Sequence, residues 1–251
     1  MEQGRYTRQV KSKQKSIALP FKATSSNKDG SANRAMRSEF ADEIVSRKKN
    51  DFFSAAFATY GARDGEFLIR GLDIAGSAAI FFFTMPVMMI ATLVMKITSP
   101  GPILYKQRRI GKNGRLFTMY KLRTMITNAE ERTGPVWAGE NDSRVTPVGR
   151  ILRRTRLDEL PQLFNVLRGD MSLVGPRPER PYFVSRYKAL QGVRLSVKPG
   201  ITGLAQIRNG YNLRPEHKIK YDYLYIKKRS LLLNLYILIK TVPIIFSKKG
   251  W

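Results

Sequence analysis

Two adjacent carboxylates follow a run of arginines near the middle of the chain. Asp158 and Glu159 come directly after Arg153, Arg154 and Arg156. We expect a helix to begin at Asp158, because aspartate is a good N-cap residue, and the helix dipole and the arginines would both keep the carboxylates ionised. An ionised aspartate can attack phosphorus, and a carboxylate can hold Mg²⁺ through oxygen. Helix capping alone would also explain Asp158, so the spacing leaves a catalytic and a structural role open.

A proline-rich loop carries two further arginines. The stretch 171–175 predicts a short strand, and the sequence GPRPERP that continues from it places Arg177 and Arg180 between prolines. A stiff loop lowers the cost of holding a guanidinium group against phosphate, where bidentate contacts are strongest. Arg177 is therefore a candidate phosphate ligand. The alternative is a structural arginine that pairs with Glu179.

A basic hairpin precedes the carboxylates. Residues 103–105 and 116–120 predict short strands on either side of a turn at 111–114. Lys121 and Arg123 are two residues apart, so on a strand they share a face and could bind phosphate together. A basic rim that faces lipid explains these cations equally well.

The residues around the carboxylates predict two helices and a glycine-rich turn. A short basic helix is expected over 150–155. A second helix would run from Asp158 to its end at Gly169, with Pro161 tolerated in its first turn. Its apolar stripe consists of Leu160, Leu163, Phe164 and Leu167. The sequence KPGITGLAQI at 198–207 is a turn into a short strand, which could approach a nucleotide or could only turn the chain.

An uncharged stretch of 22 residues, 74–95, is long enough to cross a bilayer. Pro86 near its middle predicts a kink or break. The sequence allows a kinked spanning helix, a re-entrant hairpin or a buried core helix. We favour re-entrance, because basic residues on both flanks prefer the cytoplasmic side, which a single crossing cannot provide. These flanking residues are Arg63, Arg70, Lys96, Lys106, Arg108 and Arg109.

A second apolar stretch lies at residues 231–246 and is short for a span. Lys240 and Pro243 interrupt it, and basic residues flank it. These features are typical of a helix in the plane of the membrane interface. Packing in the core against the first apolar segment is the alternative.

Composition limits the classes of function. The 251 residues include 45 Lys and Arg against 19 Asp and Glu, which gives a net charge of +26. Such an excess indicates a polyanionic partner, which could be nucleic acid, an anionic membrane or a phosphorylated substrate. The chain has no cysteine, and His217 is its only histidine. Disulfides, thiolate chemistry and multi-histidine metal sites are therefore excluded.

From about residue 66 onward, the chain resembles the bacterial sugar transferase family, the monotopic phosphoglycosyl transferases. The resemblance is carried by SPGPILYKQRRIGKNGRLFTMYKLRTM (99–125), NDSRVTPVGRILRRTRLDELPQLFNVLRGDMSLVGPRP (141–178), KPGITGLAQI (198–207) and the two apolar segments. It implies a mixed α/β monotopic membrane protein with a re-entrant helix-break-helix hairpin, interfacial amphipathic helices and a small cytoplasmic catalytic core with short strands. Residues 1–65 would be a mostly disordered basic tail, 66–98 the hairpin broken at Pro86, and 99–251 the catalytic core with a C-terminal interfacial helix.

The resemblance also implies a reaction at the cytoplasmic face of the bacterial inner membrane. Family members transfer sugar-1-phosphate from a UDP-sugar to a polyprenyl phosphate, release UMP and require Mg²⁺. By the family pattern Asp158 is the nucleophile, and Glu159 assists with metal or with activation of the lipid phosphate. Phosphate would be held by Arg177, Arg153 and Lys121, and the nucleotide would lie near Gly200, Thr202, Gly203 and Gln206.

Two other functions remain as alternatives. A membrane-associated nucleic-acid-binding protein would explain the charge, but its aromatic residues would be interleaved with the basic ones, whereas here they cluster in the apolar segments. A scaffold without catalysis would not need the Asp158-Glu159 pair or the Arg177 loop. The expected partners are therefore a UDP-sugar, polyprenyl phosphate and the membrane, without nucleic acid. The sequence leaves the oligomeric state open, a homodimer included.

Overall fold

A computed structural model describes residues 65–131, 134, 136, 142–209 and 215–246. The tail expected at 1–65 therefore lies, but for Gly65, outside the described residues. Among the described residues, α4 (Glu66–Thr98) is the one helix that is long and apolar enough to cross a membrane. In the stretch of 18 residues with the highest mean hydropathy in α4, only 6% is buried against the rest of the chain.

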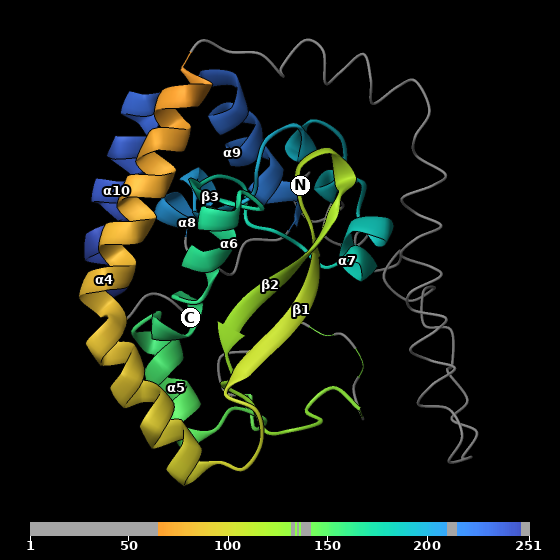
Figure 1. The fold of residues 1–251 in the computed structure, drawn as a ribbon. Coiled ribbons are helices and arrows are strands. Elements are labelled where there is room, and N and C mark those ends of the chain that lie inside the picture. Colours follow the sequence, from red (N-terminus) through yellow and green to blue (C-terminus); the bar gives the residue numbers. More distant parts are fainter. Residues whose placement is uncertain (1–64, 132–133, 135, 137–141, 210–214, 247–251) are drawn as a thin grey trace, which may run out of the picture. The chain divides into compact units, whose positions relative to one another are not determined.

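The break expected at Pro86 is not present, because α4 continues through this residue. Proline removes one backbone donor and crowds the carbonyl four residues earlier. In a helix of 33 residues, the hydrogen bonds on both sides persist. Figure 1 shows one continuous ribbon that changes direction in its second half. The helix therefore changes direction without being broken at Pro86.

The first turns of α4 are anchored to the rest of the fold by polar contacts. Arg70 donates from Nη1 to the carbonyl of Val166 at 2.6 Å and from Nη2 to that of Leu167 at 2.8 Å. The buried carboxylate of Asp73 accepts from Ser172 Oγ and from the backbone N–H of Leu173, both at 2.8 Å. These contacts satisfy groups that would otherwise be buried without partners.

The other end of α4 packs against the same core. Met95 is 3% exposed and lies in a cluster with Leu122 and Leu152. Between the two anchored ends, apolar side chains of α4 such as Phe82 and Phe83 are exposed. The helix therefore contacts the core near both ends and leaves its middle uncovered.

The expected hairpin is present with longer strands. Strands β1 (Leu104–Ile110) and β2 (Leu116–Leu122) are antiparallel, and Tyr105 pairs with Lys121. The single-turn η1 (Lys112–Gly114) joins them and needs two left-handed residues, Asn113 and Gly114, of the types that tolerate positive φ.

The helices around the carboxylates start at different residues from those expected. Helix α5 (Pro147–Arg154) begins before residue 150, because the side chain of Thr146 caps it by accepting from the N–H of Gly149 at 2.9 Å. Asp158 does not cap the second helix. It lies in the 3₁₀ turn η2 (Leu157–Glu159), and α6 (Gln162–Arg168) begins only after Pro161. Pro161 has no N–H to continue a helical ladder, which explains the interruption.

A two-stranded parallel sheet supports the proline-rich loop. Strand β3 (Ser172–Val174) pairs with β4 (Gly200–Thr202), and the two chains approach so closely that a Cβ on Gly200 would overlap the backbone nitrogen of Gly175. The remaining helical elements are α7 (Pro181–Arg186), η3 (Lys188–Leu190), η4 (Gly192–Ser196), α8 (Leu204–Asn209), α9 (Pro215–Lys228) and α10 (Leu231–Phe246).

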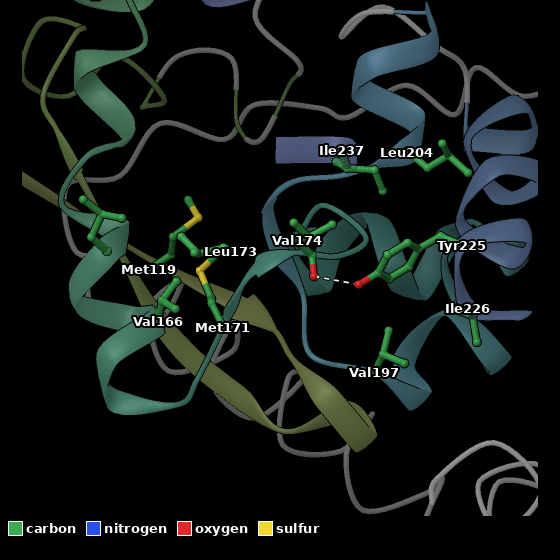
Figure 2. Close-up of a cluster of buried hydrophobic side chains, with 11 residues drawn as sticks. Met119, Val166, Met171, Leu173, Val174, Val197, Leu204, Tyr225, Ile226 and Ile237 are labelled. Atoms are coloured by element: carbon green, nitrogen blue, oxygen red, sulfur yellow. Dashed lines mark hydrogen bonds between the residues drawn. The ribbon is translucent and has the colours of Figure 1, made fainter. Parts of the chain in front are cut away.

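The main hydrophobic core lies between β2, α6, the parallel pair and the C-terminal helices (Figure 2). Tyr225 of α9 is 1% exposed and donates from its hydroxyl to the carbonyl of Val174 at 2.9 Å. Ile237 of α10 is fully buried, whereas Leu232 and Ile239 on its other side are exposed. Helix α10 thus packs on the core with one face and presents apolar side chains outward with the other.

Candidate active site

The two carboxylates lie in a strained turn. Arg156, which directly precedes η2, has φ 59° and ψ 11°, the left-handed region that non-glycine residues rarely occupy. Such strain persists only where surrounding contacts fix it, and it is often found at functional sites. Asp158 and Glu159 are 6% and 5% exposed. The turn therefore holds two acidic groups in a position with little water.

Two cations hold the carboxylate of Glu159. Lys121 Nζ lies 2.7 Å from Oε1, and Arg177 Nη2 lies 2.5 Å from the same oxygen, with Arg177 Nη1 3.4 Å from Oε2. Burial opposes ionisation of Glu159, but Arg177 and Lys121 outweigh it and keep its pKa well below the usual value. Glu159 is consequently a permanent anion with a fixed orientation.

Asp158 differs from its neighbour in electrostatic environment. Burial raises its pKa to about 6, and the adjacent negative charge of Glu159 acts in the same direction. Lys121, Arg153 and Arg156 lower the pKa and limit the rise. Asp158 is therefore ionised at neutral pH, yet it is more basic than an ordinary aspartate. This combination suits a carboxylate nucleophile.

The loop that carries Arg177 is fixed through its backbone. Arg194 donates to the carbonyl of Arg177, and Arg109 Nη1 donates to the carbonyl of Pro178 at 3.0 Å. Downstream, the N–H of Ile110 donates to the carbonyl of Glu179 at 3.1 Å. These contacts hold the backbone independently of the Arg177 side chain.

Glu179 lies close to two other cations. Its carboxylate lies 3.5 Å from Lys218 Nζ and 3.8 Å from Arg109 Nη1. The close ion pair of Arg177 is with Glu159, while its charge is one of several that lower the pKa of Glu179. Arg180 pairs with Glu130 instead.

The other predicted phosphate ligands lie in different places. Arg153 donates from Nε to Thr124 Oγ1 at 2.7 Å and is close enough to Asp158 to lower its pKa. Arg123 points to the end of α4, where it donates to the carbonyl oxygens of Ser99, at 2.8 Å, and Pro100. The structure thus brings Lys121, Arg177 and Arg153 to the carboxylate pair, and it places Arg123 on a helix end.

The predicted nucleotide loop packs against the backbone beneath the Arg177 loop. Gly200 and Gly203 are the positions where a Cβ would overlap Gly175. Thr202 Oγ1 lies 2.8 Å from Thr241 Oγ1 of α10, and Gln206 donates from Nε2 to the carbonyl of Ile201 at 3.1 Å. These contacts account for the glycines through close backbone packing, and the link to a nucleotide stays a prediction.

Comparison with known proteins identifies the family. A family model described as bacterial sugar transferase matches residues 65–248. The chain belongs to this family. A relative from Aeromonas hydrophila, named UDP-N-acetylgalactosamine-undecaprenyl-phosphate N-acetylgalactosaminephosphotransferase, is 42% identical over 190 residues, which are 73% of this chain and 45% of the relative.

Two further relatives carry the name UDP-glucose:undecaprenyl-phosphate glucose-1-phosphate transferase. The protein from Klebsiella pneumoniae is 44% identical over 179 residues, which are 68% of this chain and 38% of the relative. The protein from Caulobacter vibrioides is 43% identical over 182 residues, which are 69% of this chain and 68% of the relative. The chain spans less than half the length of the Aeromonas and Klebsiella proteins.

Sequence reasoning missed a buried ion pair in this bacterial sugar transferase. Arg194 Nε lies 2.7 Å from Asp222 Oδ2, and both side chains are under 5% exposed. Through its contact with the Arg177 carbonyl, Arg194 joins this pair to the proline-rich loop. The partners are 28 residues apart and lie in different elements. The local signal was an aspartate between two tyrosines in α9.

Proposed function

We propose that this protein transfers sugar-1-phosphate from a UDP-sugar to undecaprenyl phosphate and releases UMP. The observation that carries the proposal is the buried Asp158 beside Glu159, whose carboxylate is held by Lys121 and Arg177. The names of the relatives support the same substrates and the same bond. Asp158 caps no helix in the structure, and membership of the family supports a catalytic role for it.

The reaction proceeds in two displacements. First, a carboxylate oxygen of Asp158 attacks the β-phosphorus of the UDP-sugar, the bond from that phosphorus to the bridging oxygen breaks, and UMP leaves. An oxygen of undecaprenyl phosphate then attacks the same phosphorus, and the bond to Asp158 breaks. Cations near the carboxylates offset the repulsion between an anionic nucleophile and anionic substrates. Because Asp158 holds the group between steps, a soluble donor and a lipid acceptor can use one site in turn.

Mg²⁺ belongs to this proposal as a cofactor. The described residues contain no group of three or more acidic, histidine or cysteine side chains placed to hold a metal. Asp158 and Glu159 nevertheless fit Mg²⁺, which typically binds one or two carboxylates together with substrate phosphates and water. When bound there, the ion would neutralise charge on the diphosphate. Glu159 Oε1 already contacts two cations, so it would share that oxygen with the ion.

A covalent intermediate provides the test of this function. Purified protein incubated with a panel of UDP-sugars and Mg²⁺, but without lipid acceptor, is expected to release about one equivalent of UMP per chain with the correct donor. Its intact mass should rise by one sugar phosphate, and later addition of undecaprenyl phosphate should discharge the adduct. A strict requirement for both substrates before any UMP appears would contradict the covalent route. If the protein turns over none of the UDP-sugars in the panel, the proposed reaction is contradicted.

We further propose that α4 enters the membrane from the cytoplasmic face and returns to it. The core contacts α4 near both ends, at Ile69 and at Met95. These residues are about 39 Å apart along a straight helix, which exceeds the hydrocarbon thickness of about 30 Å. A helix crossing the bilayer in that position would draw part of the polar core into lipid. A bent helix that dips into one leaflet avoids this cost and still buries the exposed apolar side chains.

Single cysteines can test this placement, because the chain contains none. Phe67→Cys and Lys96→Cys mark the two ends of α4, where both native side chains are exposed. A membrane-impermeant maleimide added to intact cells should label neither variant, and both should react in inverted membrane vesicles. The cysteine-free parent controls for background. Labelling of one end from outside the cell would contradict re-entrance and support a spanning helix.

A further inference from the structure

The outer edge of β2 is paired by a side chain instead of a strand. Asn165 of α6 accepts from the backbone N–H of Tyr120 through Oδ1 at 3.2 Å and donates from Nδ2 to the carbonyl of Thr118 at 2.7 Å. Alternate residues of a strand present their N–H and C=O groups to opposite edges, so these two groups face away from β1. The amide of Asn165, which is fully buried, completes the ladder at that edge.

The orientation of this amide is determined by its partners. Nδ2 also lies 3.4 Å from Asp170 Oδ2, while Oδ1 faces an N–H donor. The backbone carbonyl of Asn165 in turn accepts from the N–H groups of Asp170 and Met171, at 3.0 and 3.2 Å. A flipped amide would oppose a carbonyl and a carboxylate, so only one orientation satisfies every group.

This arrangement connects the two elements that form the active-site ion pair. Tyr120 directly precedes Lys121 on β2, and Asn165 follows Glu159 by six residues on the η2–α6 segment. Because Asn165 fixes β2 against α6, it also fixes the approach of Lys121 Nζ to Glu159 Oε1, which are 2.7 Å apart. We propose that Asn165 is a positioning residue that holds Lys121 on Glu159. Its catalytic consequence rests on the proposed function, whereas its structural consequence does not.

A double-mutant cycle tests the catalytic consequence. Asn165→Leu removes both bonds to β2 at similar volume, and Lys121→Met removes the charge. We expect N165L to lower kcat about 10- to 100-fold, because small displacements of catalytic groups have effects of this size. The KM for the UDP-sugar should change less than about twofold. If Asn165 acts through Lys121, the double variant should be no slower than K121M alone. If the loss of kcat in the double variant equals the product of the two single-variant losses, the proposal is overturned.

A second measurement does not depend on enzyme turnover. It therefore tests the positioning role of Asn165 separately from the proposed function. Lys121 is 17% exposed, and its ammonium group is held by Glu159. Peptide mass spectrometry after brief treatment with an amine-reactive reagent should show Lys121 modified several-fold faster in N165L than in the parent. An unchanged rate would overturn the positioning role, even if the protein released no UMP from any donor. Failure of the parent to release UMP would contradict only the proposed function.

Two further variants guard against a general loss of folding. Asn234→Leu is the matched control, because Asn234 is also a buried asparagine but its side chain accepts from the hydroxyl of Tyr225 of α9, far along the chain from β2. N234L should leave kcat and the labelling of Lys121 at parental values, and an equal change in N234L would overturn a specific role. If N165L does not fold, Asn165→Asp replaces it, since the carboxylate retains the acceptor for Tyr120 and loses the donor to Thr118. The same two measurements then decide.

Discussion

Asparagine in place of Asp158 is expected to reduce UMP release at least about 10⁴-fold, as the loss of a nucleophile typically does. The amide has almost the same shape as the carboxylate but carries no charge and is not a nucleophile. Asp158 is buried, so no other carboxylate from solvent can replace it. Intact mass spectrometry should show no sugar-phosphate adduct on D158N under conditions where the parent accumulates one.

The matched control is Glu131→Gln, which makes the same chemical change at an exposed carboxylate. E131Q should keep parental turnover and adduct formation. Removal of the negative charge of Asp158 should not unfold the protein, since burial already disfavours that charge. Turnover by D158N within about tenfold of the parent would remove Asp158 from the role of nucleophile. It would leave Glu159 as the remaining carboxylate of the pair.

The charged residues of this candidate site could be located from sequence, whereas their pairing could not. The Asp158-Glu159 pair, the preceding arginines and the stiff Arg177 loop are contiguous in the chain, so their types and spacing indicated a phosphate site. Lys121 and Arg177, however, meet at Glu159 from 38 and 18 residues away. Sequence periodicity cannot predict these contacts, because they depend on how β2 and the loop pack around η2.

The differences within the predicted elements have local causes. The helix expected from Asp158 begins four residues later, because Pro161 interrupts the hydrogen-bond ladder. As a result, side-chain cations, and not a helix dipole, stabilise the charge of Glu159. Strand alternation placed Arg123 on the same face as Lys121 and so predicted a phosphate ligand. However, β2 ends at Leu122, and the chain beyond it turns this arginine toward Ser99.

The long-range polar contacts of α4 could not be predicted from sequence for a similar reason. Asp73 and Arg70 precede the uncharged stretch and could be read only as its flanks. In the structure they bind β3 and the end of α6, about a hundred residues further along the chain. The apolar pattern therefore predicted where α4 lies in sequence, but the contacts that attach it to the rest of the fold follow from the tertiary structure.

Methionine in place of Arg177 is expected to lower kcat/KM about 10²- to 10³-fold, the usual loss when one group that stabilises transition-state charge is removed. R177M deletes the guanidinium that holds both oxygens of Glu159 and that the reaction would present to phosphate. Steady-state UMP release across a range of UDP-sugar concentrations measures the loss. Arg177→Lys should fall between R177M and the parent, since lysine keeps the charge but loses the bidentate geometry. Arg186→Met, at an exposed arginine stacked 3.7 Å from the ring of Tyr182, is the matched control and should keep parental activity.

The effect of R177M can be assigned to the side chain because the loop does not depend on it. Arg194 binds the carbonyl of residue 177, Arg109 binds that of Pro178, and both contacts persist when the guanidinium is removed. The backbone should therefore stay in place, and the melting temperature of R177M should remain close to that of the parent. Lys121 alone would then hold Glu159, whose pKa should rise because its largest stabilising charge is gone. Parental kcat/KM in R177M would mean that the guanidinium only balances the charge of Glu159, and the phosphate would have to be bound by Lys121 and Arg153 instead.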